Sequence, residues 1–125
     1  MELVSRLWPN VERALHWIDH YGDRDGDGFV EYARRSDRGL VQQGWKDSTD
    51  SVFHQNGSLA EPPIALCEVQ AYVFAAKRWI AELARLRGDN ATAIRLEQEA
   101  QTLRKKFWDA FWCPDLNMWH IAFLE

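Results

Sequence analysis

An almost uninterrupted apolar run near the middle of the chain constrains the fold more than any other feature of the sequence. The run begins at Ile64, directly after a pair of prolines, and is apolar at nearly every position as far as Ala76. A helix that is apolar on nearly all sides has to be buried on most of them. The sequence therefore predicts a helix over Ile64–Arg87 that other helices cover.

A second helix is expected to follow this one directly. Gly88 can end the first helix, and Asp89 and Asn90 favour the start of the next, which predicts a tight αα-hairpin. The partner helix is expected from Ala91 to about Trp112, with Pro114 ending it. Its apolar stripe consists of Leu96, Ala100, Leu103, Phe107 and Phe111.

The remaining segments are an N-terminal helix, a long connection and a tail. The helix is expected over Leu7–Tyr21, with Pro9 either in its first turn or kinking it. Gly22 is expected to cap it, because glycine tolerates the left-handed conformation. The segment 23–63 is rich in Gly, Asp, Ser, Asn and Gln, and irregular connections of that length are uncommon unless they carry function. The short apolar stretch 116–124 is expected to be extended. The apolar residues of the N-terminal helix are Leu7, Val11, Ala14, Leu15 and Ile18.

Composition and charge exclude several classes of function. The 125 residues include 15 basic and 19 acidic side chains, and the basic residues form no block, so nucleic acid is not an expected partner. No apolar stretch reaches the roughly 18 residues that a membrane span needs, and the N-terminus lacks a signal-peptide pattern, so a cytoplasmic location without membrane contact is the expectation. Cys67 and Cys113 lack any short spacing and are expected to be free thiols.

A compact acidic loop follows the first helix. Carboxylates alternate with glycines there, and such a loop can surround Ca²⁺ with the oxygen ligands that this ion prefers. An EF-hand is excluded, because the twelfth residue counted from Asp23 is Arg34, where a bidentate Glu is required. A structural calcium site and a solvated Asp-Gly turn remain equally open. The candidate ligands are the carboxylates of Asp23, Asp25, Asp27 and Glu31 and the carbonyl of Phe29.

The chemically densest segment is 39–51, where two carboxylates, a lysine, hydroxyls and a tryptophan lie close together. Seven tryptophans are several times the usual number for so short a chain. An indole face can pack against a sugar ring, although most of the seven are expected to fill the core. His16 and His20 are one helical turn apart and could bind a metal, but a solvated pair is the commoner arrangement.

In these segments the chain closely resembles the amylo-α-1,6-glucosidase family of glycogen-debranching enzymes and the related glucoamylase-like and mannosylglycerate hydrolase-like barrels. The resemblance rests on three runs, 23–32, 43–51 and 63–72, and extends more loosely to 107–112, so it covers most of the chain. The specific run is Gln43-Gly44-Trp45-Lys46-Asp47-Ser48, followed by Asp50-Ser51.

The resemblance implies a fold, a reaction and a set of site residues. The fold is an (α/α)6 barrel, in which six inner helices are ringed by six outer ones. The reaction is the hydrolysis of α-linked glucosyl bonds, such as the α-1,6 branch points of glycogen-like glucans, with inversion. Asp47 matches the general acid at the barrel mouth, and the acidic loop is similar to a calcium-binding loop of some relatives. The residues expected to contact the α-glucan substrate are Gln43, Trp45, Lys46, Asp50 and Glu68.

Only part of such a barrel is present. About three helices are expected, and no second catalytic carboxylate is recognisable, although an inverting glycosidase needs a base about 6.5–9.5 Å from the acid. Residues 1–125 are therefore expected to be an all-α fragment of the catalytic domain, a partial toroid that is inactive alone and exposes apolar helix faces that favour self-association. A small calcium-stabilised helical module that binds carbohydrate or protein without catalysis is the alternative, and a helical structural protein without a ligand ranks last.

Overall fold

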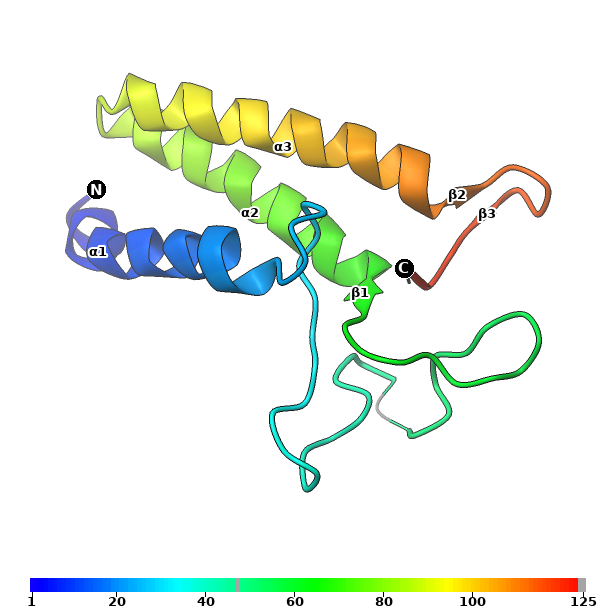
Figure 1. Cartoon of the computed structure of the whole chain (residues 1–125). Helices are drawn as coiled ribbons and strands as arrows, with labels where there is room; N and C mark the ends of the chain where they lie inside the picture. Colours follow the sequence, from blue (N-terminus) through cyan, green and yellow to red (C-terminus); the bar gives the residue numbers. More distant parts are fainter. Residues whose placement is uncertain (47, 124–125) are drawn as a thin grey trace.

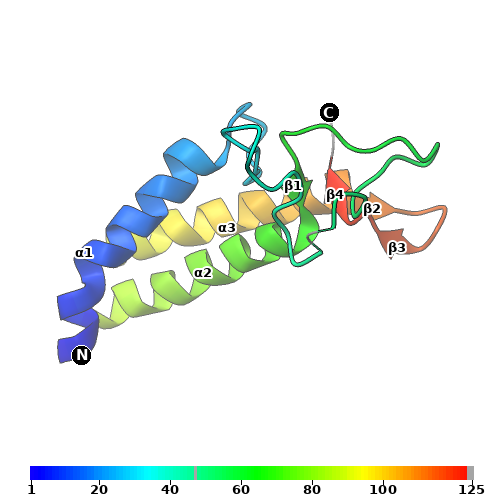
Figure 2. The same ribbon diagram turned by 90° about the horizontal axis from the view of Figure 1, so that it is seen from below.

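The computed structural model describes residues 1–46 and 48–123. These residues are mostly helical, as the sequence predicts, and the long loop and the short strands gather at one end of the helices (Figures 1 and 2). In the described part of the chain, no helix is long and apolar enough to cross a membrane. The helical elements are α1 (Glu2–Trp17), the π-helical turn η1 (Ile18–Gly22), α2 (Cys67–Leu86) and α3 (Asn90–Phe111).

The helix α1 begins five residues earlier than the expected Leu7. Pro9 therefore lies inside the helix, where a proline removes one internal hydrogen bond. The turn before Pro9 is nevertheless helical. Trp8, in that turn, and Leu15, further along the helix, are both buried. The residues of α1 and η1 that pack into the core are Val4, Trp8, Val11, Leu15 and Ile18, whereas Leu7 and Ala14 of the apolar pattern are exposed.

Gly22 ends the first helical segment at the expected residue but for a different reason. The glycines with positive φ in the described residues are at 26, 28, 57 and 88, so Gly22 does not adopt the left-handed conformation. A Cβ on Gly22 would instead lie 3.2 Å from a methyl carbon of Val30 and 3.5 Å from the Trp17 ring. The chain after the acidic loop therefore packs tightly against Gly22, and a Cβ there would have to push Val30 aside.

The expected hairpin of two long helices is confirmed. In Figure 1, α2 and α3 lie side by side and antiparallel. Gly88 turns the chain with a φ of +82°, and the Asp89 carboxylate caps α3 by accepting a hydrogen bond of 3.0 Å from the Thr92 amide.

The hairpin begins three residues later than expected, because a short strand replaces the expected first turn, and it ends at Phe111, within one residue of the expected end. The strand β1 (Ala65–Leu66) pairs antiparallel with β4 (Ala122–Phe123), so α2 begins at residue 67 and not at 64. The strand β2 (Trp112–Cys113) pairs with β3 (Met118–Trp119) and ends α3 before Pro114 is reached. The expected extended tail 116–124 consists of β3 and β4 with a turn before them, and Leu124 lies outside the described residues.

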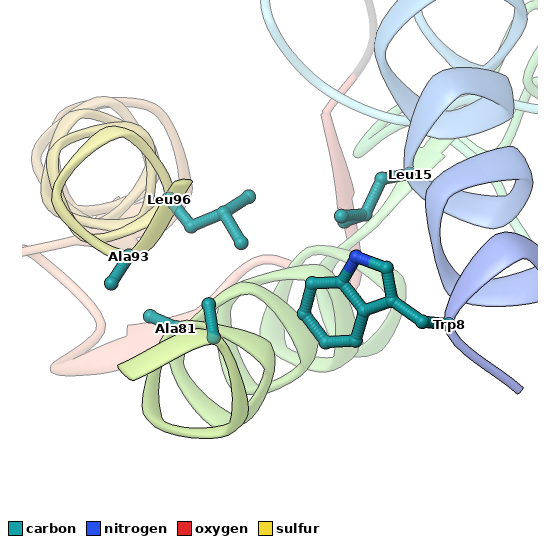
Figure 3. Packing of buried hydrophobic residues seen from close by; sticks show 6 residues of the cluster. Trp8, Leu15, Ala81, Ala93 and Leu96 are labelled. Carbon is teal, nitrogen blue, oxygen red and sulfur yellow. The ribbon is translucent and has the colours of Figure 1, made fainter. Parts of the chain in front are cut away.

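One of the three core clusters in the described residues lies where α1 packs against the groove between the two hairpin helices (Figure 3). Trp8 and Leu15 of α1 point into that groove, toward residues of α2 and α3 that are fully buried. Three of them are alanines, which let the helix backbones approach closely. These buried residues are Ala81, Ala84, Ala93 and Leu96.

The helix α2 is not buried on most sides in this chain. Its inner residues Val73, Ala81 and Ala84 are buried, but Tyr72 and Trp79 on the outer side are 70% and 71% exposed. Leu86 continues the same exposed row one heptad further. The apolar run is therefore covered by α1 and α3 on one side only, and its other side is a bare apolar face.

Candidate functional site

The acidic loop has the geometry of a small oxygen cage. Asp23, Asp25 and Asp27 each bring a carboxylate oxygen within 4.8 Å of the other two. Backbone amides hold them there: the two oxygens of Asp23 accept hydrogen bonds of 2.7 and 2.9 Å from the amides of Gly26 and Gly28. Carboxylate oxygens gathered in this way are ligands that Ca²⁺ prefers.

Of the other two expected ligands, Glu31 contacts a backbone amide and the ring of Phe29 packs in the core. Glu31 lies outside the group of three, and its Oε2 accepts a hydrogen bond of 3.1 Å from the Arg24 amide across the mouth of the loop. The Phe29 ring is buried and meets the Phe111 ring edge to face at 5.2 Å between centroids. Phe29 therefore anchors the loop in the core.

Burial raises the pKa of Glu31 to about 7, and the neighbouring carboxylates of Asp25 and Asp27 act in the same direction. The folded protein therefore keeps a proton on Glu31 at pH values where the unfolded chain, with a pKa near 4.5, has released it. A raised carboxyl pKa contributes stability that is fully present below the unfolded pKa and is lost as pH rises through the folded pKa.

We therefore expect Glu31→Gln to stabilise the metal-free protein relative to the wild type above pH 7 but not below pH 4.5. The glutamine is neutral at every pH and avoids the cost of placing a third negative charge beside two aspartates. The measurement is urea unfolding of both proteins with chelator across that pH range. Identical pH profiles for the two proteins would contradict the assignment.

Two side chains on the helices fix the loop to the bundle, and sequence analysis missed both roles. The Gln70 side chain makes a two-way clamp on Val30, accepting from its amide at 2.8 Å and donating to its carbonyl at 2.7 Å. Lys106 of α3 donates to the Asp27 carbonyl at 2.6 Å. Gly28 is favoured here because its φ of +93° is strained for any residue with a Cβ, and a Cβ would also displace the Lys106 ammonium.

Residues 43–46 and 48–51 belong to a largely exposed loop at the same end of the molecule. Asp47, the expected general acid, lies outside the described residues. Trp45 is 74% exposed, and the Lys46 ammonium is 5.3 Å from the centroid of its ring. The side-chain amide of Gln43 donates a hydrogen bond of 3.3 Å to the Leu40 carbonyl, and Asp50 is exposed to solvent.

Glu68 lies next to this loop, in the first turn of α2. A Cβ on Gly44 would be 3.6 Å from a Glu68 carboxylate oxygen and 2.4 Å from a methyl carbon of Leu66. Only glycine allows so close an approach of the loop backbone to the start of the helix. The structure thus brings Glu68 against the backbone of the expected substrate-binding segment.

A hydrogen bond joins two polar side chains, Tyr32 and Gln42, and Gln42 lies directly before the 43–51 segment in the sequence. The Tyr32 hydroxyl donates to the side-chain oxygen of Gln42, which is 1% exposed, and burial raises the pKa of Tyr32. Sequence analysis gave Gln42 no role. Gln42 and Gln43 are the same residue type in the same irregular segment, so the sequence does not indicate which of the two is buried.

The remaining candidates have no metal-binding geometry. The rings of His16 and His20 are 4.0 Å apart, and Nδ1 of His20 lies 2.9 Å from the His16 carbonyl. Within residues 1–46 and 48–123, the three aspartates of the acidic loop are the one group that could hold an ion. Cys67 and Cys113 are free, as expected, and burial raises the pKa of Cys67.

Comparison with known proteins adds no relative. No protein-family model matches the chain, and no curated protein sequence matches it.

Proposed function

We propose that this chain is part of the catalytic domain of an (α/α)-barrel glycoside hydrolase that cleaves α-linked glucosyl bonds, with Asp47 as its general acid. The observation that carries the proposal is the contact between Gly44 and the start of α2. Through this contact Glu68 lies beside Gly44. The residue after Gly44 is Trp45, whose side chain is mostly exposed to solvent. An exposed aromatic ring suits the C–H face of a sugar, and a carboxylate suits its hydroxyls.

The proposed reaction needs two carboxyl groups. The Asp47 carboxyl gives its proton to the glycosidic oxygen as the bond from that oxygen to the anomeric carbon breaks. Water attacks the opposite face of the anomeric carbon, and a second carboxylate takes the proton of that water. Glu68 would bind sugar hydroxyls near the acid. The base would come from outside residues 1–125.

The proposal is tested on the protein encoded by a longer reading frame that includes these residues. We expect glucose release from a limit dextrin, with β-glucose as the first anomer in the proton NMR spectrum because the reaction inverts configuration. Residues 1–125 alone are expected to release none. A longer protein that binds the dextrin without releasing glucose would favour the alternative, a calcium-stabilised carbohydrate-binding module.

Calcium is proposed as a structural ion of the acidic loop. The three carboxylates fit a hard cation, because their oxygens already lie within 4.8 Å of one another. Since Ca²⁺ would bind only the folded loop, we expect it to raise the unfolding temperature and a chelator to reverse the rise. Asp25→Asn should abolish the effect and Asp37→Asn, in an exposed turn, should retain it. An unfolding temperature that ignores both Ca²⁺ and chelator would end the calcium proposal.

Self-association is proposed for the chain when it is isolated. Tyr72, Trp79 and Leu86 form an exposed apolar row on α2, and such a row favours association in water. We expect sedimentation velocity to show concentration-dependent oligomers, and Trp79→Glu to shift the chain toward monomer. The matched control is Trp17→Glu on α1, which is 50% exposed and lies outside this row. A wild-type chain that is monomeric at every concentration tested would refute the proposal.

A further inference from the structure

A cleft of about 660 Å³ opens at the loop end of the bundle, apart from the acidic loop and from the 43–51 segment. One wall is the turn that carries Phe53, His54 and Gln55. The other wall is the C-terminal hairpin, which contributes Asp115 and His120. The volume lies within the roughly 300–1,000 Å³ of small-molecule sites in proteins.

The two walls are held in place by the fold. Val52 is 3% exposed and packs in one cluster with Ile64, Leu66 and Ala122, so the first wall is joined directly to the second through β1 and β4. The turn closes on itself through a hydrogen bond of 2.8 Å from the His54 amide to the Ser58 carbonyl. The cleft is therefore formed before any ligand arrives.

The lining chemistry favours a neutral ligand with hydroxyl groups. Phe53 is 61% exposed and offers an apolar ring. Within the described part of the chain, the side chains of His54, Gln55, Asp115 and His120 make no hydrogen bond or ion pair, so their donors and acceptors are available. No Lys or Arg lines the cleft, which leaves an anionic ligand without a counter-charge.

We infer that this cleft is a saccharide-binding subsite, in which a sugar ring lies on Phe53 and its hydroxyls contact the imidazoles, the amide and the carboxylate. The saccharide class follows from the lining. The choice of an α-glucan rests on the proposed function. Because the cleft and Trp45 lie on different segments of the same end, the subsite would hold a part of the glucan chain away from the bond that is cleaved.

The test is titration of the 125-residue chain with maltotriose, in the Trp79→Glu background to limit association, followed by the ¹H–¹⁵N NMR spectrum. We expect saturable shifts confined to the amides of 52–55 and 113–123, with binding weakened about tenfold in Phe53→Ala and also reduced in Asp115→Asn. Both residues are exposed, so the spectra of the variants should otherwise match the wild type. Leu40→Ala, at an exposed site outside the cleft, is the matched control and should bind normally.

Several results would overturn the inference. These are the absence of saturable shifts in the cleft, a Phe53→Ala variant that binds as well as the wild type, and equal binding of triglycine. The result is separable from the proposed function. Binding in the cleft by a protein whose longer form releases no glucose would remove the hydrolase proposal and keep the subsite, whereas glucose release without cleft binding would do the reverse.

Discussion

Asp47→Asn is expected to lower the rate of glucose release from a limit dextrin by about 10²–10⁴-fold in the longer protein. An amide has the shape of the carboxyl group but cannot give a proton to the departing oxygen. The loss should fall on kcat, because the proton moves only in the transition state and substrate binding would keep its other contacts. Steady-state kinetics on purified variants measures both constants.

Two controls distinguish a proton donor from a residue that merely holds the loop. Asp37→Asn changes an exposed aspartate of the same irregular segment and should leave the rate unchanged. With α-glucosyl fluoride, whose leaving group needs no proton, Asp47→Asn should lose far less activity than it does with dextrin. An equal loss on both substrates, or a dextrin rate within a fewfold of the wild type, would show that Asp47 is not the acid.

The helices of this chain could be predicted from the sequence because their signal is local. The stripe from Leu96 to Phe111 repeats every three or four residues, and all of it faces α2 or the loop end in the structure. The strand at 65–66 could not be predicted in the same way. Its partner lies at 122–123, and apolar residues of either strand are equally typical of a helix.

The candidate site divides along the same line. The aspartates of the acidic loop are close in sequence, so their proximity to one another could be predicted from their spacing alone. The hydrogen bonds of Gln70 to Val30 span 40 positions, and that of Lys106 to Asp27 spans 79. No local sequence pattern predicts contacts over such separations. Lys77 is a similar case, because a lysine in an apolar helix gives no indication of which carboxylates it meets.

Lys77→Ala is expected to be among the most destabilising single changes in the described part of the chain. The Lys77 ammonium lies 2.7 Å from an oxygen of Asp19 and 2.8 Å from an oxygen of Glu99, and its side chain is only 10% exposed. It thereby joins η1, α2 and α3 in one ion cluster. Removing the cation leaves Asp19 without this partner and Glu99 paired only with Arg95, in a half-buried crevice.

We expect the free energy of unfolding to fall by about 2–3 kcal/mol, at or below the lower end of the range for a broken buried ion pair. The reason is that the two carboxylates are 27% and 30% exposed and can regain water. Lys77→Met keeps the apolar stem of the side chain. The difference in unfolding free energy between Lys77→Ala and Lys77→Met therefore measures the packing of the stem, and the difference between Lys77→Met and the wild type measures the charge. Urea unfolding at neutral pH, in the Trp79→Glu background to limit association, gives both values.

The matched control is Arg85→Ala, which breaks an ion pair with Glu97 on the surface of the same two helices. Exposed pairs gain little from their charge because water screens it, so this variant should unfold almost as the wild type does. If Lys77→Ala were no worse than Arg85→Ala, the cluster would contribute nothing and apolar packing alone would hold α1 and η1 against the hairpin. If Lys77→Met recovered all of the loss, the stem of the lysine, and not its charge, would be the stabilising part.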